Sequence, residues 1–292
     1  MNQYKYSLDS SSQKFVCPRC GKQTFVKYIE NANGNYLDDE FGRCDRETNC
    51  AFHNPPKNNK GGFFVCCKPK PKPSFHSLEI VEKSFSRNEE NNFVEFLKTL
   101  FTEDEVKQVR SKYLIGTSKH FKGATIFWQI DNFERVHAGK ILQYIPETGK
   151  RAKSTDGKGL INWVHSVNKT EDFHLEQCLF GLHLINETNQ KTIAIVESEK
   201  TAVIMSVFKP EYTWLSTGSK QGFKQAMLEP IKGYKIIAFP DKSEFEDWNH
   251  KAIELNAKGF KIFVSDWIEK SDLDPGCDLA DIFIDEMTNK LM

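Results

Sequence analysis

Apolar and polar residues follow patterns that divide the chain into three parts. The first part covers residues 1–67, where Asn33-Gly34 lies between two short β-prone stretches at 24–29 and 35–41. Asn-Gly is the strongest short signal for a hairpin turn, so this part is expected to contain a β-hairpin. Lys and Pro then alternate within 68–74. Alternating proline excludes a helix and predicts an extended linker between domains.

The second part, 75–175, combines helical and strand patterns. Apolar residues at positions 93, 96, 97 and 100 recur at helical spacing, and Thr102 with Glu105 has the spacing of a capping box that begins another helix. Two strand-like stretches follow at 124–130 and 136–144, joined by a polar turn and followed by a basic loop at 148–153. These patterns predict a small α+β segment.

The third part, 176–292, alternates short apolar runs with helical patterns. Strands are predicted at 192–196, 212–215, 236–239 and 260–264, and helices at 199–208, 246–257 and 278–291. Strands that alternate with helices of this length form right-handed βαβ units, in which helices cover both faces of a parallel sheet. The fold class is therefore predicted to be α/β, with a Rossmann-like sheet in the C-terminal part.

Composition and charge narrow the functional classes. The hydrophobic fraction is 39%, and no apolar run approaches the roughly 18 residues that a membrane span needs. The polar start, residues 1–14, lacks the apolar core of a secretory signal, so a cytoplasmic protein without a membrane partner is expected. Residues 1–75 carry 12 Lys/Arg against 7 Asp/Glu, whereas residues 176–292 carry 13 against 19. This asymmetry suggests nucleic-acid contact by the basic part and cation binding by the acidic part.

Four of the eight cysteines lie within the first 50 residues. Two residues separate Cys17 from Cys20, five separate Cys44 from Cys50, and the predicted hairpin lies between the pairs. In a reducing compartment this clustering favours a tetrahedral Zn²⁺ site over disulfides, and such a site stabilises a segment too small for a large core. Because five residues exceed the usual spacing, His53 is an alternative to Cys50 as the fourth ligand. The first part is thus predicted to be a zinc ribbon.

Basic side chains near these motifs are candidates for nucleic-acid contact, since Lys and Arg neutralise phosphates. They are Arg19 and Lys22 in the zinc ribbon and Lys140, Lys150, Arg151 and Lys153 around the second hairpin. Tyr144 and Trp163 lie near the second group and could stack on unpaired bases, whereas Trp128, inside an apolar strand, is better explained as a core residue. For the loop residues, a solvated hairpin tip is the alternative interpretation.

Acidic residues follow the predicted strands of the third part. Glu197 and Asp241 each come after an apolar strand, and Asp278 and Asp281 lie at the start of the last helix. Open α/β sheets bind ligands at the carboxyl ends of their strands. Acidic groups that meet there would repel one another unless a divalent cation lay among them, and carboxylate oxygens select Mg²⁺ or Mn²⁺. Glu199 fits the plainer role of a helix N-terminal charge.

These motifs resemble the toprim domain of bacterial primases and topoisomerases. The resemblance is carried by Glu197-Ser-Glu-Lys-Thr-Ala202 after a strand, by the strand that ends at Asp241, and by Asp278-Leu-Ala-Asp281. The stretches 123–130, 137–144 and 150–153 resemble the part of primases that precedes the metal site. Nearly the whole chain resembles toprim proteins with a primase-type zinc finger, which occur on mobile elements of Bacteroides-like bacteria.

The resemblance implies primer synthesis from nucleoside triphosphates on single-stranded DNA, in replication of a mobile element, with a helicase or another replication protein as candidate partner. Glu197 and Asp241 would be catalytic and would bind Mg²⁺ together with Asp278 and Asp281. Ser243 replaces the second Asp of the family's Asp-x-Asp motif, although Glu244 or Asp247 in the following helix could compensate. That departure keeps two alternatives open: a single-stranded DNA-binding accessory protein with a degenerate site, and a toprim nuclease.

Overall fold

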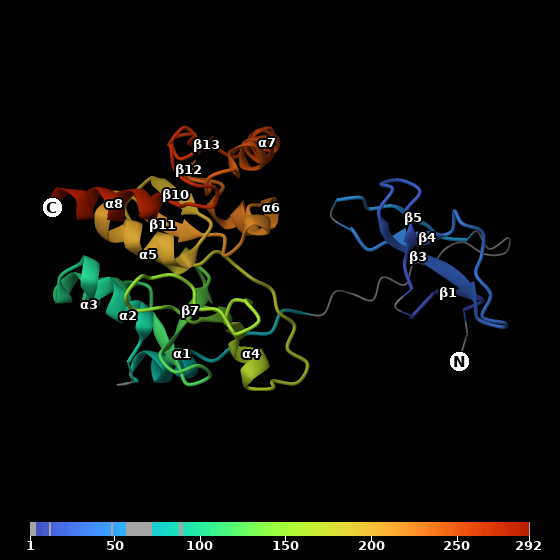
Figure 1. Ribbon diagram of the computed structural model, residues 1–292, viewed down its shortest axis with the longest axis horizontal. Coiled ribbons are helices and arrows are strands. Elements are labelled where there is room, and N and C mark those ends of the chain that lie inside the picture. The colour runs from blue at the N-terminus through green and yellow to red at the C-terminus, as the bar shows by residue number, and fades with distance from the viewer. Residues whose placement is uncertain (1–3, 12, 48, 57–71, 88–89, 292) are drawn as a thin grey trace. The chain divides into compact units, whose positions relative to one another are not determined.

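The computed structural model describes residues 4–11, 13–47, 49–56, 72–87 and 90–291. The chain forms two compact units, Met1–Pro69 and Lys70–Met292 (Figure 1). Most of the predicted Lys-Pro linker lies outside the described residues. Within the described part of the chain, no helix is long and apolar enough to cross a membrane.

The first unit contains a small antiparallel β-sheet. Its strands are β1 (Tyr6–Leu8), β2 (Phe15–Val16), β3 (Gln23–Glu30), β4 (Gly42–Cys44) and β5 (His53–Asn54). The strand order is β1-β3-β4-β5, and β2 also pairs with β3. β3 is therefore the central strand, and it covers the first arm of the predicted hairpin.

The second arm of that hairpin differs from the prediction. The turn itself forms, because Gly34 adopts a φ of 73° and its N–H donates to the Glu30 carbonyl at 2.8 Å. The returning residues 35–41, however, make an isolated bridge and a few backbone hydrogen bonds to β3 without forming a strand. The strand that pairs with β3 begins at Gly42. The acidic run at 38–40 has low β propensity, which explains why the paired strand starts only after these residues.

The second unit begins with helices and an antiparallel sheet, called here the middle sheet. The elements are α1 (Leu78–Phe85), α2 (Asn92–Leu100), α3 (Glu103–Lys112), β6 (Gly116–Ser118), β7 (Ala124–Ile130), β8 (Val136–Leu142), β9 (Ile161–Trp163) and the short α4 (Val164–Val167). The sheet order is β6-β7-β8-β9. The predicted capping box begins α3, since the Glu105 N–H donates to Thr102 Oγ1 at 3.4 Å and the Thr102 N–H donates to Glu105 Oε2 at 2.9 Å. β8 ends two residues earlier than predicted, and Tyr144 bridges to Arg151 instead.

The remainder of the second unit contains the predicted parallel sheet. Its strands are β10 (Thr192–Val196), β11 (Thr213–Ser216), β12 (Lys235–Ala238) and β13 (Ile262–Val264), in the order β11-β10-β12-β13 and all parallel. The helices are α5 (Glu199–Phe208), α6 (Gln225–Leu228), α7 (Phe245–Asn256) and α8 (Leu279–Leu291), with 3-10 turns η1 (Leu182–Asn186), η2 (Lys220–Gly222) and η3 (Glu229–Ile231). The alternation predicted from the sequence is confirmed, with ends that differ by a few residues.

The two sheets of the second unit share one hydrophobic core. It includes Phe93 of α2, Phe127 of β7, Phe180, Val196 of β10 and Trp214 of β11. A second core lies between the parallel sheet and helices α6 and α7, so that α5 and α8 cover one face of this sheet and α6 and α7 the other (Figure 1). A third core lies between the middle sheet, α1 and α4. The shared core fixes the carboxyl edge of the parallel sheet relative to the loops of the middle sheet.

Candidate functional site

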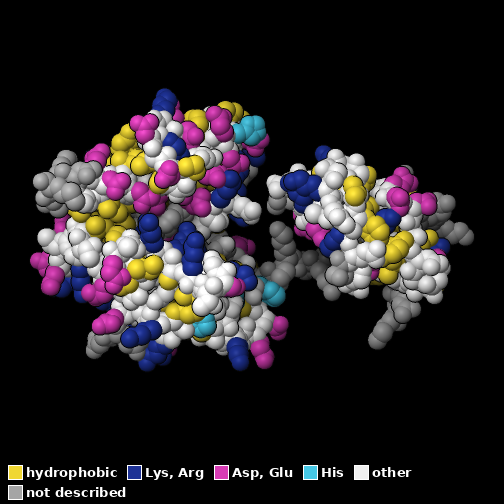
Figure 2. All heavy atoms as spheres, in the orientation of Figure 1, with side chains coloured by type: hydrophobic (Ala, Val, Ile, Leu, Met, Phe, Trp, Pro, Cys, Tyr) yellow, Lys and Arg dark blue, Asp and Glu magenta, His cyan; other side chains and the backbone are white. Residues whose placement is uncertain are grey.

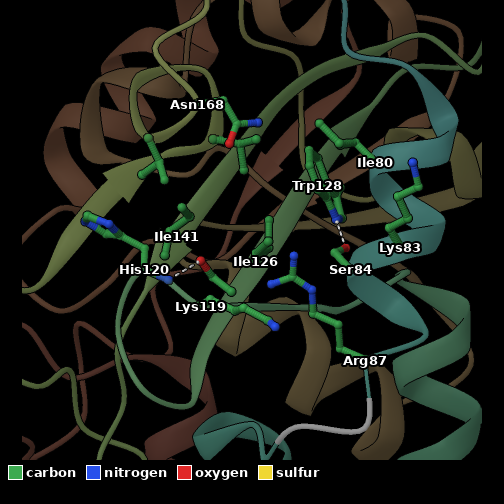
Figure 3. Close-up of a pocket in the computed structure, with 13 residues that line it drawn as sticks. Ile80, Lys83, Ser84, Arg87, Lys119, His120, Ile126, Trp128, Ile141 and Asn168 are labelled. Carbon is green, nitrogen blue, oxygen red and sulfur yellow. Dashed lines mark hydrogen bonds between the residues drawn. The ribbon is translucent and has the colours of Figure 1, made fainter.

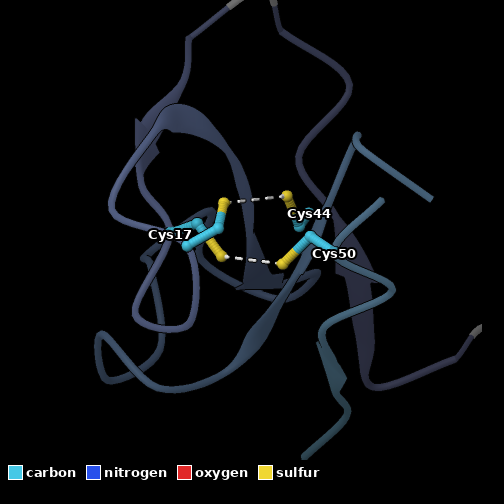
Figure 4. A group of neighbouring side chains, drawn as sticks. Cys17, Cys44 and Cys50 are labelled. Carbon is cyan, nitrogen blue, oxygen red and sulfur yellow. Dashed lines mark hydrogen bonds between the residues drawn. The ribbon is translucent and has the colours of Figure 1, made fainter. Parts of the chain in front are cut away.

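The four cysteines predicted to bind zinc lie together in the first unit (Figure 4). The sulfurs of Cys17, Cys20, Cys44 and Cys50 are all within 4.8 Å of one another. The Cys17 and Cys50 sulfurs are 3.7 Å apart, and those of Cys20 and Cys44 are 4.0 Å apart. A Zn–S bond of about 2.3 Å in a tetrahedron requires sulfurs about 3.8 Å apart. The cluster therefore fits a structural Zn²⁺ ion.

The backbone around Cys20 favours a thiolate at that position. Gly21 adopts a φ of 67° and donates its N–H to the Cys17 carbonyl at 2.9 Å, which closes the tight turn between the pair and β3. The backbone N–H of Lys22 lowers the pKa of the Cys20 thiol to about 6, whereas burial raises the pKa of the Cys50 thiol to about 11. Cys20 thus supplies a thiolate at neutral pH, and a bound dication would stabilise the remaining thiolates.

His53, the alternative ligand, lies outside this cluster. Its Nε2 is 2.9 Å from the Tyr28 hydroxyl, and the two rings stack with centroids 6.1 Å apart. Cys50, which is 6% exposed, occupies the fourth ligand position instead. Arg19 and Lys22 are exposed and make no ion pair among the described residues, so they stay candidates for phosphate contact.

The predicted acidic residues lie at the carboxyl edge of the parallel sheet. Glu197 follows β10 directly, and Asp241 follows β12 after Phe239 and Pro240. Asp278 caps α8: its backbone N–H donates to Asp281 Oδ2 at 2.9 Å, and the Asp281 N–H donates to Asp278 Oδ1 at 3.2 Å. Lys200 of α5 lies 3.8 Å from Asp278 and 3.6 Å from Asp281, and so offsets part of this negative charge.

The electrostatics of Asp241 show that these acids affect one another. Burial raises the pKa of the Asp241 carboxyl to about 8, and the charges of Asp278, Glu197 and Asp281 contribute in that order. Burial also raises the pKa of Glu197, followed by the charge of Glu244. Several carboxylates therefore share one field at this edge, and a cation among them would relieve their repulsion.

The described acidic side chains at this edge do not form a compact group of metal ligands. Among the described residues, the four cysteines form the only group of three or more His, Cys, Asp or Glu side chains with ligand atoms within 4.8 Å of one another. The Asp241 side chain has no hydrogen bond or ion pair within the described part of the chain, so its oxygens are available to a ligand. Mg²⁺ usually keeps several waters and binds through one or two carboxylates together with substrate phosphates.

The raised pKa of Asp241 predicts how stability changes with pH. The folded protein keeps a proton on this carboxyl up to about pH 8, whereas the unfolded chain loses it near 3.8. The contribution of Asp241 is therefore fully present below that lower pH and is lost as the pH rises toward 8, by up to about 1.4 kcal/mol per pH unit. Asp241→Asn should remove this loss in urea unfolding without added divalent cation. The Asp247→Asn control removes an exposed carboxylate and should retain it; equal pH profiles for wild type and Asp241→Asn would contradict the prediction.

The position that departs from the toprim motif has a particular geometry. Ser243 is exposed, adopts a φ of 78° and donates its N–H to Glu269 Oε2 at 2.8 Å. The next residue, Glu244, places its carboxylate where its charge raises the pKa of Glu197. Its Oε1 accepts from Lys220 Nζ at 2.5 Å, and its buried Oε2 has no partner among the described residues. Glu244 thus places a carboxylate near Glu197 and could substitute for the one absent at position 243. Asp247, the other acidic residue of the following helix considered for this role, forms an ion pair with Lys251.

The basic loop of the middle sheet faces these acids across one cavity. The cavity has a volume of about 690 Å³, and both acidic residues and residues of the basic loop line it. Its charged lining residues are Lys150, Arg151, Lys153, Lys200, Asp241, Asp278 and Asp281. The three loop residues are exposed, and the space-filling view shows basic and acidic side chains gathered around a hollow of this unit (Figure 2). The structure therefore brings most of the predicted acidic and basic residues of the second unit together.

Lys140 is the exception among the predicted basic residues. It is 5% exposed, and its ammonium lies 2.9 Å from Glu199 Oε1 and 3.1 Å from Oε2. It is therefore a buried ion-pair partner, and the expectation of a surface phosphate contact needs correction. Glu199, expected to be a plain helix N-terminal charge, is 2% exposed and does begin α5. The sequence did hold a signal, because Lys140 lies between Ala138 and Leu142 on one face of β8.

A second hollow of about 230 Å³ lies against the other face of the middle sheet (Figure 3). Its walls are mainly apolar and include Trp128, whose Nε1 donates to Ser84 Oγ at 2.9 Å. Trp128 is fully buried, as predicted for a core residue. Lys83, Arg87 and Lys119 lie at the rim, and none of the described lining residues is a carboxylate. This hollow is separate from the acidic site.

The chain belongs to a family described as a domain of unknown function (DUF6371), which matches residues 91–242 and so covers just over half of the chain. A second family, described as a zinc beta-ribbon finger, matches residues 4–62 and includes all four clustered cysteines. No curated protein matches the chain. Glu197 and Asp241 both lie within the first of these matched regions.

Several solved structures of primases are similar to the chain. The primase fragment of the bacteriophage T7 primase-helicase protein is 15% identical, with a TM-score of 0.44, and the match covers 96% of this chain and 97% of that one. A DnaG primase catalytic domain bound to single-stranded DNA is 13% identical, with a TM-score of 0.46 and coverages of 71% and 74%. The E. coli primase catalytic core is 13% identical, with a TM-score of 0.42 and coverages of 72% and 77%.

Proposed function

We propose that this protein is a primase-like enzyme that synthesises primers on single-stranded DNA by divalent-cation-dependent phosphoryl transfer. One observation carries the proposal: a single cavity has Asp241, Asp278 and Asp281 on one side and the cations of the 148–153 loop on the other. Acidic oxygens bind the cation that a triphosphate carries, and the loop cations neutralise its phosphates. Such a pairing of charges suits a polyphosphate better than a neutral ligand.

Glu197 does not line this cavity, but its charge raises the pKa of Asp241, which does. The residues of the site would have distinct roles. Asp241 and Glu197 would hold the cation, which when bound orients the triphosphate and offsets charge that develops during transfer. Glu197 is half-buried and its pKa is raised, which brings it closer to the range where a carboxylate accepts a proton from an attacking hydroxyl. Lys150, Arg151 and Lys153 would contact phosphates.

The single-stranded template would approach along the middle sheet. A hollow of about 820 Å³ lies there, lined by Asn92, Lys119, Lys122 and Gln143 among others. It shares Lys119 with the hollow of Figure 3, and Gln143 immediately precedes Tyr144 of the acidic cavity. Lys122 in this hollow, with Lys83 and Arg87 in the hollow of Figure 3, would contact the phosphates of the strand, while Glu90 offsets part of this positive charge. The proposed setting is replication of a mobile element in the cytoplasm, with a helicase or another replication protein as partner.

Primer synthesis tests this function directly. Glu197→Gln should lower the rate of ribonucleotide incorporation on single-stranded DNA by about 10²- to 10⁴-fold, because it removes a cation ligand and proton acceptor. The measurement is gel-resolved primer formation with Mg²⁺ or Mn²⁺. Glu211→Gln, which changes an exposed carboxylate outside the cavity, should match wild type.

The exposed Ser243 favours the second candidate function, a single-stranded DNA-binding accessory protein with a degenerate site. Tight DNA binding by wild type and Glu197→Gln, with neither primers nor cleavage products, would overturn the catalytic proposal in favour of this candidate. Metal-dependent strand cleavage that Glu197→Gln abolishes would identify a nuclease instead.

A further inference from the structure

A buried polar cluster joins the middle sheet to the parallel sheet. Lys140 of β8 donates from Nζ to both Glu199 oxygens, at 2.9 and 3.1 Å, and to the Gly218 carbonyl at 2.7 Å. Both charged side chains are less than a tenth exposed. The ammonium group therefore links two elements of the parallel-sheet region: the first residue of α5 and the turn that follows β11.

That turn lies directly against Glu197. The Gly218 N–H donates to the Glu197 carbonyl at 2.9 Å, and the Thr217 N–H donates to the Val196 carbonyl at 3.1 Å. Gly218 adopts a φ of 73°, and a Cβ there would lie 3.1 Å from Glu199 Oε1. A larger residue would therefore be strained and would crowd the ion pair. The ion pair therefore packs closely against the turn at Gly218.

The same turn supplies neighbours to the Glu197 carboxylate. Burial raises the pKa of Glu197, and the backbone N–H of Lys220 opposes part of that rise. The Lys220 ammonium donates to Glu244 Oε1 at 2.5 Å. On the other side, β8 ends at Leu142, two residues before Tyr144 at the wall of the acidic cavity. Lys140 is thus connected both to the turn beside the acids and to the strand that leads into the basic loop.

We propose that Lys140 and Glu199 form a positioning pair, which holds turn 217–220 and sets Glu197 relative to the basic loop. The pair touches neither wall of the cavity, so its effect passes through the backbone of the turn. A buried ion pair can often be replaced by well-packed apolar residues without loss of stability, so stability alone does not explain this pair. The hydrogen bond from the Lys140 ammonium to the Gly218 carbonyl of the turn indicates a positional role. The inference rests on the proposed function for its kinetic consequence only.

Gln129 of β7 provides a matched control. It is 1% exposed, and neither its amide nitrogen nor its amide oxygen has a partner among the described residues. Its nitrogen would be 3.6 Å from a Cβ at Gly218, so it lies beside the same cluster. Gln129→Met changes a buried polar side chain in the same place without breaking a hydrogen bond, and should leave the activity unchanged.

The test uses the full-length, zinc-loaded double variant Lys140→Met/Glu199→Leu, in which no buried charge is left unpaired. We expect a thermal midpoint close to that of wild type, a kcat for primer synthesis lowered roughly ten- to hundredfold, and an unchanged KM for nucleotide. Lys140→Arg, with Glu199 intact, keeps the charge and should recover part of kcat. Hydrogen exchange at the amides of 217–220 should accelerate in the double variant, while exchange in β7 and β10 stays at the wild-type rate.

A double variant with the kcat of wild type, or with wild-type exchange at 217–220, would overturn the positioning role. Loss of activity that tracks loss of thermal stability across all variants would also overturn it, because the pair would then be merely structural. If wild type itself makes no primers, the proposed function fails. The exchange measurement still decides whether the pair holds the turn, so the two failures are distinguishable.

Discussion

Cys44→Ser is expected to abolish zinc binding and to unfold the first unit. Structural Zn²⁺ contributes about 10–16 kcal/mol to the folding of small domains. The core of this unit offers little else, because its buried cluster consists of Phe25 and three of the four cysteines, with few partly buried apolar neighbours. Zinc content by metal analysis and amide dispersion in NMR spectra would measure the loss.

The matched control for this experiment is His53→Gln. His53 contacts Tyr28 and lies outside the sulfur cluster, so this variant should keep one equivalent of zinc and its fold. Full zinc content in Cys44→Ser, or loss of zinc in His53→Gln, would contradict the ligand assignment. Wild-type protein with less than about half an equivalent of zinc would count against the site as a whole.

Lys140→Met alone should lower the free energy of unfolding of the second unit by about 3–5 kcal/mol. The substitution leaves Glu199, which is 2% exposed, as a buried carboxylate without its cation. Urea unfolding followed by tryptophan fluorescence would measure the change, and adding Glu199→Leu should restore most of it. Lys235→Met removes an exposed lysine of β12 and should have little effect. A single variant within about 1 kcal/mol of wild type would show that Glu199 gains water or another partner.

Local patterns predicted much of the fold because they depend on neighbours in sequence. The capping box at Thr102 and Glu105 needs two residues three positions apart, and it forms with both hydrogen bonds. Strands and helices that alternate in the last part lead to a parallel sheet through general rules of connection. The second arm of the first hairpin was wrong because residues 35–41 were interpreted as a β-prone stretch, although the three acidic residues at 38–40 disfavour a strand there.

Site residues could be predicted where the sheet topology determines their position. They could not be predicted where their position depends on tertiary packing. Glu197 and Asp241 reach one edge because parallel strands end together, so spacing alone could place them. The pairing of Lys140 with Glu199 spans 59 positions and depends on how two sheets pack. The proximity of Glu244 to Glu197 likewise depends on the path of the chain through Ser243, whose positive φ no local pattern indicated.

The core common to the two sheets limits how the chain can be divided. The ring centroids of Phe127 and Phe180 lie 5.4 Å apart in an edge-to-face arrangement. The Tyr113 hydroxyl donates to the Trp214 carbonyl at 2.9 Å. A fragment that ends near residue 175 would expose Phe127 and Tyr113 to water, and the complementary fragment would expose Phe180 and Trp214. Each half would then present a large apolar patch and tend to aggregate. Co-expression of the two fragments is the arrangement in which either should remain in solution.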